Sequence, residues 1–234
     1  MLLIAGWTKG APYLISLQSP DLKFRDLPEL APFRELVTAG VVSGGSLIFA
    51  DLPGDAPLDP VLSVLRQSVR ADPWTALYGP SQSSAVPIAV FSDFRCPNCR
   101  VMDARLSEIA ADDPDAIRIV RHELPIFGGA SITASRAALA ADLQGAYQEM
   151  YDRLIRTPAV TDEAYILHLA TQIGIDPAKL MIDMQSDVVT TTLLRSRAIA
   201  DVFAFFGTPA FAVGRTVFMG TVPTSVLRSL IADP

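Results

Sequence analysis

The chain has 234 residues, of which 50% are hydrophobic and 19% are charged. This composition can bury a full core and is too apolar for intrinsic disorder, so we expect a globular protein of one or two domains. The formal net charge of −6 arises from 19 basic and 25 acidic residues. It offers no basic surface for nucleic acid or for an anionic membrane, so we expect no nucleic-acid partner.

The first 17 residues support two interpretations. Two apolar runs, Met1–Trp7 and Pro12–Leu17, stand on either side of Lys9. They are typical either of the end of a secretory signal or membrane anchor whose basic beginning is missing, or of a plain N-terminal strand. An anchor would place the protein outside the cytoplasm. Further along, residues 73–92 carry no charge but contain three prolines, so they do not predict a membrane-spanning helix.

Residues 1–84 are expected to form an N-terminal extension. Ser46–Ala50 is a candidate strand, and Asp59 followed by Pro60 predicts the start of a helix. A soft linker, Tyr78–Val86, then suggests a domain boundary. The apolar stripe of the predicted helix consists of Val61, Leu62, Leu65 and Val69.

A strand–helix–strand unit with parallel strands is predicted after the linker. Pro87–Phe91 is a short apolar run typical of a buried strand, and Ile117–Val120 predicts a second one. Between them Met102, Leu106 and Ile109 recur at helical spacing until the acidic and proline residues 112–114 end the helix.

The remainder predicts a helical block followed by a hairpin and a last helix. The helices are expected over Ser131–Leu143, around Tyr147–Ile155, from Thr161 to Gly174, from Asp176, and from Ser186 or Asp187 towards Phe206. Two short apolar runs on either side of Gly214 and Arg215 predict the hairpin, and Pro223 opens the terminal helix.

The two cysteines form a CxxC motif, Cys96-Pro97-Asn98-Cys99, at the junction of a predicted strand and helix. There Cys96 falls at the N-cap, where unsatisfied backbone N–H groups and the helix dipole favour a thiolate. Pro97 at the first helical position stiffens the turn without removing a needed hydrogen bond. Cys99, one turn later, is expected to point inward and to resolve mixed disulfides.

The two cysteines have two alternatives to redox exchange: they could form part of a metal site, or a purely structural disulfide. A four-ligand zinc site needs both His122 and His168, which nothing in the sequence brings together. Soft thiolates can bind Cu(I) with two ligands alone, which keeps a copper-binding or chaperone-like adaptor open. A disulfide that closes so short a loop stabilises little, so redox exchange is the better account.

Three motifs in order resemble the DsbA-like thiol:disulfide oxidoreductases: Phe91–Cys99, Glu123–Gly128 before an Ala-rich helix, and Phe206–Phe211 with Gly220 after a hairpin. The resemblance covers about Val86–Pro234. It implies an α/β thioredoxin fold formed by residues 85–125 and 207–234, with an inserted helical domain of residues 126–206. This agrees with the elements predicted independently above.

The resemblance also assigns site residues and partners. It implies that Pro209 is a cis-proline packed against the active-site thiols, and that the Thr208 backbone pairs with an extended substrate segment by β-augmentation. It implies that the substrates are protein thiols and disulfides outside the cytoplasm, in the periplasm or an equivalent compartment. It also implies a redox partner that reoxidises or reduces the CxxC pair. No cofactor and no metal are expected.

Asn98 stands where the CPHC enzymes of this family carry histidine. Asparagine cannot carry a positive charge to stabilise the Cys96 thiolate, so we expect a less oxidising couple. Whether the protein acts as an oxidase or as an isomerase or reductase stays open. A glutathione-dependent isomerase or transferase of related fold is a further alternative, although such relatives generally lack a CxxC pair.

Other residues near the motif are expected to be structural. Asp93 and Arg95 are expected to be solvated loop charges, with tuning of Cys96 or contact with substrate as the alternative. His122 and Glu123 are expected to close a strand, and His168 to be packed or solvated on its helix. Core packing, rather than an apolar substrate groove, is the expectation for Phe94, Met102, Phe127, Phe206 and Phe211.

Overall fold

The computed structural model describes residues 21–37, 60–80, 83–157 and 162–234. The apolar N-terminal runs, the candidate strand Ser46–Ala50 and Asp59 lie outside these ranges. Within them, no helix combines the length and the apolar character that crossing a membrane requires.

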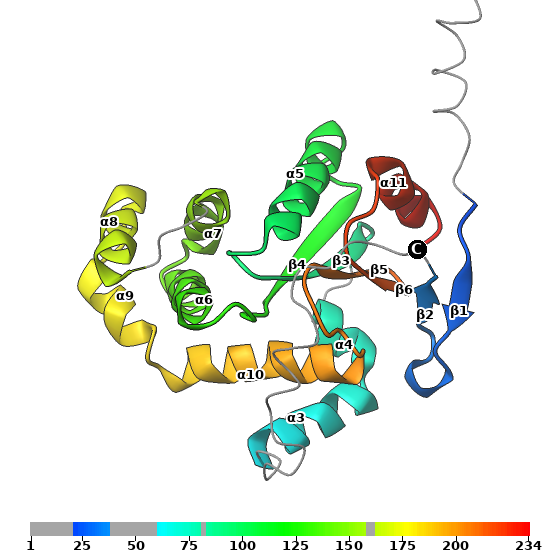
Figure 1. Cartoon of the computed structure of the whole chain (residues 1–234), viewed down its shortest axis with the longest axis horizontal. Helices are drawn as coiled ribbons and strands as arrows, with labels where there is room; N and C mark the ends of the chain where they lie inside the picture. Colours follow the sequence, from blue (N-terminus) through cyan, green and yellow to red (C-terminus); the bar gives the residue numbers. More distant parts are fainter. Residues whose placement is uncertain (1–20, 38–59, 81–82, 158–161) are drawn as a thin grey trace, which may run out of the picture.

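A six-stranded mixed sheet lies at the centre of the molecule, in the order β1-β2-β6-β5-β3-β4 (Figure 1). Strands β3 and β4 are parallel, as expected, and β5 is antiparallel to both of its neighbours, β3 and β6. Strand β2 is parallel to β6 and antiparallel to β1. The strands are β1 (Phe24–Asp26), β2 (Arg34–Leu36), β3 (Val86–Ser92), β4 (Ile117–Glu123), β5 (Ala210–Val213) and β6 (Thr216–Met219).

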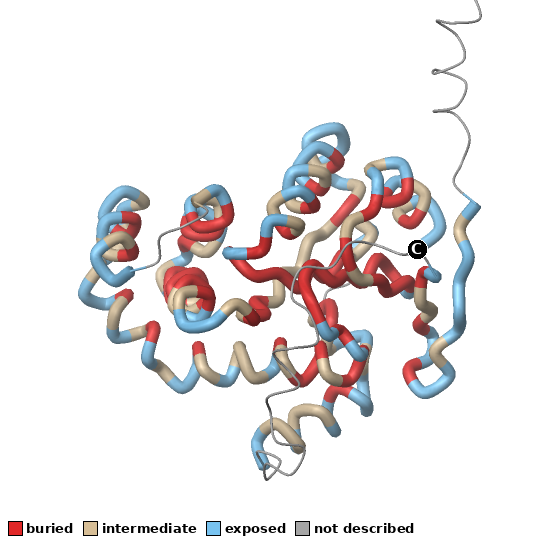
Figure 2. The backbone as a smooth tube through the Cα atoms, in the orientation of Figure 1, coloured by how far each residue is buried: buried red, intermediate tan, exposed pale blue. Residues whose placement is uncertain are grey.

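Helices cover both faces of the sheet. In Figure 1, α5 (Pro97–Asp112) and α11 (Thr224–Ala232) lie on one side of the strands. The other side is covered by α10 (Asp187–Val202), α3 (Pro60–Ala71) and α4 (Pro73–Tyr78). The central strands are therefore buried on both faces, as the tube in Figure 2 shows.

Successive side chains of β3 point to opposite faces of the sheet and pack into two different hydrophobic cores. Ile88 and Val90 pack with the buried face of α5, whereas Ala89 and Phe91 pack on the side of α10. Successive side chains of a strand point to opposite faces, so one strand with apolar residues at every position serves both cores. The predicted helix stripe on α5, of Met102, Leu106 and Ile109, is confirmed as buried.

Strand β4 is longer than predicted, because it continues through Arg121, His122 and Glu123 to the end of its register with β3. These polar residues have partners that suit a buried strand. The His122 ring stacks on Phe91 with centroids 4.5 Å apart, and its Nε2 lies 2.9 Å from the carbonyl oxygen of Leu77. His122 therefore lies at the end of the strand, which closes at Glu123 as expected.

The helical block between β4 and β5 follows the predicted order. It consists of α6 (Gly129–Asp142), α7 (Tyr147–Arg156), α8 (Glu163–Ile173), α9 (Pro177–Asp183) and α10. Helices α8, α9 and α10 begin after Asp162, Asp176 and Ser186, whose side chains accept backbone hydrogen bonds from the first turn. The expected division of the chain at residues 84, 125 and 206 stays a prediction.

Helix α10 ends at Val202, four residues before the predicted end. Ala204 adopts a positive φ of 55°, and the Phe205 N–H donates to the Ala200 carbonyl at 2.8 Å. This is a Schellman-type termination, which reverses the chain after a helix. The reversal buries Phe203 and Phe205 in the core beneath the sheet.

The N-terminal extension contributes strands that the sequence pattern does not predict. Strands β1 and β2, joined by a 3₁₀ turn (Pro28–Leu30), extend the sheet beyond β6. Each strand has three residues, too few for an alternating pattern to be recognised. Arg34 ties β2 to the body of the protein: its guanidinium donates to Thr216 Oγ1 at 2.9 Å and to Asp233 Oδ2 at 3.0 Å.

Helix α3 begins at Pro60, the residue expected to open it, but its predicted stripe is wrong at one position. Val61 is 52% exposed, whereas Val69 is buried and Leu62 and Leu65 pack partly against the core. The buried face lies over α10, where Arg66 donates to Asp201 Oδ2 from Nε at 2.9 Å. The short helix α4 was not predicted, although its N-cap Asp72 accepts from Thr75 N–H as a capping residue does.

Candidate active site

Cys96 occupies the N-cap of α5, directly after the loop that follows β3. Its sulfur accepts a hydrogen bond from the backbone N–H of Cys99 at 3.1 Å, and Pro97 stands at the first helical position. The sulfur thus faces the unsatisfied N–H groups and the positive end of the helix dipole. The local structure expected from the sequence is present at this residue.

A second segment reaches the same sulfur from the start of β5. The Thr208–Pro209 peptide bond is cis, and the Cys96 thiol donates to the carbonyl oxygen of Thr208 at 3.6 Å. Strand β5 pairs with β3, so the loop before β5 and the loop after β3 meet at one end of the sheet. The structure therefore brings the two predicted site segments, Cys96–Cys99 and Thr208–Pro209, into contact.

Cys99 lies one turn into α5 and is buried, and Cys96 is buried as well, at 0% exposure. Burial raises the pKa of the Cys99 thiol, and the neighbouring Cys96 raises it further. The thiol form of Cys99 is therefore favoured in the reduced protein. The two cysteines occupy different environments, because only Cys96 is the N-cap of the helix.

The remaining CxxC residues lie nearer the solvent. Pro97 is exposed and Asn98 is partly exposed, so the face of the motif that they form is accessible. Phe206, two residues before Thr208, is 52% exposed, and Phe127 is partly buried. The expectation of core packing is therefore wrong for Phe206 and is confirmed for Phe94, Met102 and Phe211, which are buried.

The expectation that Asp93 is a solvated loop charge is wrong. Its side chain is 0% exposed, and both carboxylate oxygens accept hydrogen bonds from protein donors. Arg95 is exposed, as expected. The available sequence signal was an acid between an apolar strand and the CxxC motif. Three of the four donors to Asp93, however, come from residues more than 30 positions further along the chain.

A partly buried polar cluster lies between the sheet and α7. Arg121 pairs with Asp103 at 3.0 Å and stacks over the Tyr151 ring, while the Tyr147 hydroxyl donates to Glu123 Oε1. Burial raises the pKa of Glu123 to about 7, although the Tyr147 hydrogen bond and the Arg121 charge oppose the shift. Glu123 ends β4 as expected, but no sequence pattern predicts this cluster.

The two histidines lie in unrelated surroundings. His168 is exposed on α8, and His122 is held in β4. In the described ranges, no group of three or more His, Cys, Asp or Glu residues is arranged to hold a metal ion.

Comparison with known proteins identifies the family. The profile of the DSBA-like thioredoxin domain matches residues 87–232. This chain belongs to the DsbA-like family. The matched region starts at β3 and reaches α11, so it contains the CxxC motif, the helical block and the Thr208–Pro209 loop of this DsbA-like chain.

Solved structures share the thioredoxin fold with its helical block. A thioredoxin-like oxidoreductase from Silicibacter pomeroyi is 31% identical with a TM-score of 0.64, and the match covers 68% of this chain and 96% of that one. The thiol-disulfide exchange protein alpha-DsbA2 from Wolbachia pipientis is 21% identical with a TM-score of 0.62, covering 74% and 96%. A periplasmic thioredoxin-like protein from Salmonella enterica serovar Typhimurium is 20% identical with a TM-score of 0.59, covering 68% and 93%.

One curated relative is much longer than this chain. A Na(+)/H(+) antiporter NhaA from Herminiimonas arsenicoxydans is 25% identical over 166 residues, which make up 70% of this chain. The DsbA-like chain spans only 24% of the length of that relative.

Proposed function

We propose that the protein is a thiol:disulfide oxidoreductase that exchanges disulfides with protein substrates through Cys96 and Cys99. The observation that carries the proposal is the position of the Cys96 sulfur. It accepts the Cys99 N–H at the start of α5 and lies 3.6 Å from the Thr208 carbonyl beside Pro209. A thiolate at such a position is stabilised and can attack, or be attacked by, another sulfur.

In the oxidising direction the protein starts with a Cys96–Cys99 disulfide. A substrate thiolate attacks the Cys96 sulfur, so a mixed disulfide forms while the Cys96–Cys99 bond breaks and Cys99 leaves as a thiolate. A second substrate thiolate then attacks the substrate sulfur of the mixed disulfide and releases Cys96. The substrate is oxidised by two electrons and the CxxC pair is reduced, and a redox partner with a disulfide or another two-electron acceptor must restore it.

In the reducing or isomerising direction the same sulfur acts first. The Cys96 thiolate attacks a substrate disulfide and expels one substrate thiolate. Cys99 then loses its proton and attacks Cys96, which releases the second substrate thiolate and leaves the Cys96–Cys99 disulfide. The uncharged Asn98 favours a less oxidising couple than a histidine would at that position, and the raised pKa of Cys99 slows this release.

We propose the periplasm, or an equivalent compartment outside the cytoplasm, as the place of action. Support comes from the Salmonella relative, which is described as periplasmic, and from the stability of disulfides in oxidising compartments. The substrates would then be extracytoplasmic protein thiols and disulfides. The Thr208 backbone is the segment proposed to pair with an extended substrate chain.

Cysteine variants test the proposal. Cys96→Ser is expected to abolish exchange in both directions, whereas Cys99→Ala is expected to accumulate a mixed disulfide between Cys96 and a reduced, unfolded substrate protein. Non-reducing electrophoresis and mass spectrometry detect that adduct. Wild-type turnover in the Cys96 variant, or an adduct formed at Cys99 when Cys96 is replaced, would refute the assignment.

A further inference from the structure

The Asp93 carboxylate accepts four hydrogen bonds from protein donors. Asp93 directly follows β3 and is three residues before Cys96 in the sequence, and its side chain is wholly buried. Both oxygens are used. The donors to Oδ1 are Arg95 N at 2.7 Å and Ser131 Oγ at 2.8 Å, and the donors to Oδ2 are Ile126 N at 2.7 Å and Phe127 N at 3.1 Å.

These four bonds join three separate parts of the chain. Arg95 belongs to the loop that carries Cys96, and the Asp93 carbonyl also accepts from Cys96 N–H at 3.0 Å. Ile126 and Phe127 belong to the connection between β4 and α6, and Ser131 lies in the first turn of α6. The carboxylate therefore fixes the CxxC loop to the entrance of the helical block.

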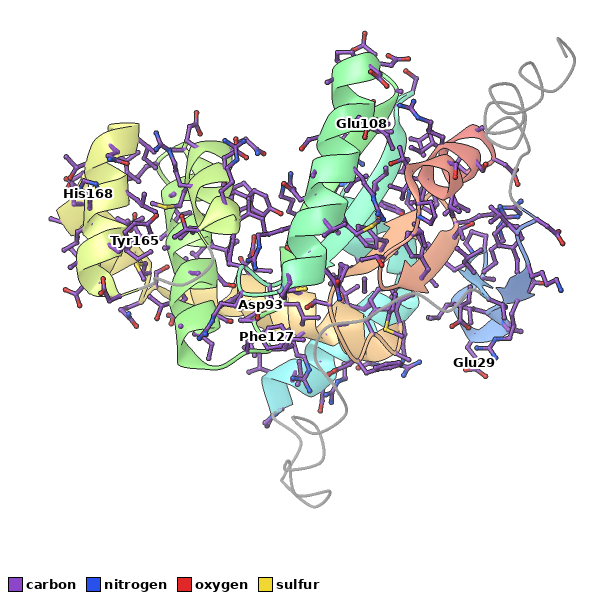
Figure 3. The ribbon with its side chains drawn as sticks, turned by 45° about the horizontal axis from the view of Figure 1, so that its top comes forward. Glu29, Asp93, Glu108, Phe127, Tyr165 and His168 are labelled. Carbon is purple, nitrogen blue, oxygen red and sulfur yellow. The ribbon has the colours of Figure 1, made fainter. Side chains whose placement is uncertain are left out.

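Phe127 is the residue through which this connection can affect a substrate. Figure 3 shows Asp93 and Phe127 close together near the N-terminal end of α5. Phe127 is partly buried and packs against the cluster that contains Cys96 and Cys99. Its backbone is held by the Asp93 carboxylate, so the position of this ring relative to Cys96 depends on Asp93.

Asparagine cannot replace Asp93 in this arrangement. A carboxylate accepts at both oxygens, whereas an amide has one acceptor oxygen and an NH₂ group that only donates. Either orientation of an asparagine would point the NH₂ group at two of the four donors. A buried donor left without an acceptor destabilises the local structure that contains it, here the contact between the two loops.

We propose that Asp93 is a positioning residue that holds the Phe127 segment in register with Cys96, so that an extended protein substrate, but not a small disulfide, meets both at once. The inference rests on the proposed exchange function. A small disulfide such as oxidised glutathione needs access to the Cys96 sulfur alone. A peptide substrate must also lie against the surface beside Cys96. Displacement of the Phe127 segment should therefore slow the reaction of Cys96 with a peptide substrate.

The test compares two substrates for each variant. Reduced protein is mixed with oxidised glutathione or with a short peptide that carries one disulfide-bonded reporter, and the rate constant for attack by Cys96 is measured for each. For Asp93→Asn we expect the peptide-to-glutathione ratio of rate constants to fall at least about tenfold, since small errors of position are costly to reaction rates. Ser131→Ala, which removes one of the four donors, should lower the ratio in the same direction by less.

Asp176→Asn is the matched control, because Asp176 also accepts two backbone N–H bonds but stands at the exposed start of α9. It should leave the ratio unchanged. A variant that only loses stability would change both rate constants by the same factor, as its folded fraction falls. An unchanged ratio in both Asp93→Asn and Ser131→Ala would overturn the inference, and Ser131→Ala decides alone if Asp93→Asn does not fold. Wild-type protein that fails to react with either substrate would instead overturn the proposed function.

Discussion

The chemistry of the site is set by which atoms face the Cys96 sulfur. The start of α5 supplies a backbone N–H donor, and the residue between the proline and the second cysteine adds no charge. Backbone dipoles at the start of α5 therefore favour the thiolate form of the sulfur.

Replacing Asn98 by histidine should make the couple more oxidising. A histidinium near Cys96 favours its thiolate, which stabilises the reduced state, and a shift of one pKa unit at Cys96 corresponds to about 30 mV in the two-electron potential. We expect Asn98→His to raise the reduction potential by about 30 mV or more at pH 6, measured in glutathione buffers. Asn98→Gln is the uncharged control, and an equal rise in both variants would contradict the explanation by charge.

Glu123 makes the stability of the fold depend on pH. Its pKa is raised by burial to about 7, above the ordinary value of 4.5. The stability that the buried, protonated acid contributes is present below pH 4.5 and is lost as the pH rises through 7. Glu123→Gln cannot ionise, so the free energy of unfolding of the variant minus that of the wild type should increase by about 2 kcal/mol from pH 5 to pH 8.

His122 provides the opposite control, because burial lowers its pKa to about 4 from the ordinary 6.5. The stability from the neutral ring is present above pH 6.5 and is lost as the pH falls through 4. The unfolding free energy of His122→Gln, relative to the wild type, should therefore increase on acidification. Denaturant unfolding at several pH values measures both slopes, and parallel curves for Glu123→Gln and wild type would contradict the assignment to Glu123.

At the scale of elements, the N-terminal extension braces the helix that leads to the Thr208–Pro209 loop. Phe33 packs edge-to-face on Phe203 with ring centroids 5.1 Å apart, and Phe203 is followed by Phe205 in the same core. Arg66 on α3 pairs with Asp201, in the last turn of α10. The extension thus lies outside the matched family region but shares its core with it.

Removing the Phe33 ring should destabilise the whole fold. The side chain is almost fully buried, and Phe→Ala substitutions in cores cost about 3–5 kcal/mol because they lose apolar contact and leave a cavity. We expect Phe33→Ala to lower the free energy of unfolding by about 3 kcal/mol, measured by urea denaturation.

Phe24→Ala is the matched control, because Phe24 is 36% exposed on β1 and contacts the Arg34 guanidinium. Its loss should cost less than about 1 kcal/mol. If Phe33→Ala were no more destabilising than Phe24→Ala, the extension would not be part of the core.

The elements that could be predicted from the sequence are those with long, regular patterns. The α5 stripe, the α7 face and the hairpin all have apolar residues at the spacing of their secondary structure. Strands β1 and β2 have three residues each. Strand β2 owes its place to pairing with β6 and to Arg34, and β1 pairs in turn with β2. The early end of α10 depends on burying Phe203 and Phe205, which is a tertiary effect.

The same distinction holds for the site. Local features of Cys96, Pro97 and Cys99 follow from a CxxC motif at a strand–helix junction, and the structure has them. The burial of Asp93 could not be predicted, because it depends on donors from Ile126, Phe127 and Ser131, which reach it only in the folded chain. Local sequence predicts local geometry, and long-range contacts decide which charges are buried.

At the scale of the whole molecule, the reactive end of the sheet is assembled from three parts of the chain. The loop after β3 carries Cys96, the loop before β5 carries Thr208 and Pro209, and the connection into the helical block carries Phe127. We expect this assembly to hold a thiol pair that cycles between dithiol and disulfide during exchange with proteins.

The reduction potential of the Cys96–Cys99 pair tests that claim most directly. Purified protein is equilibrated in glutathione buffers, and free thiols are counted by mass spectrometry after alkylation. We expect one two-electron transition, at a potential below the roughly −120 mV of DsbA and above about −300 mV. A potential below about −300 mV, typical of structural disulfides, or a pair that forms no disulfide in any buffer, would contradict it.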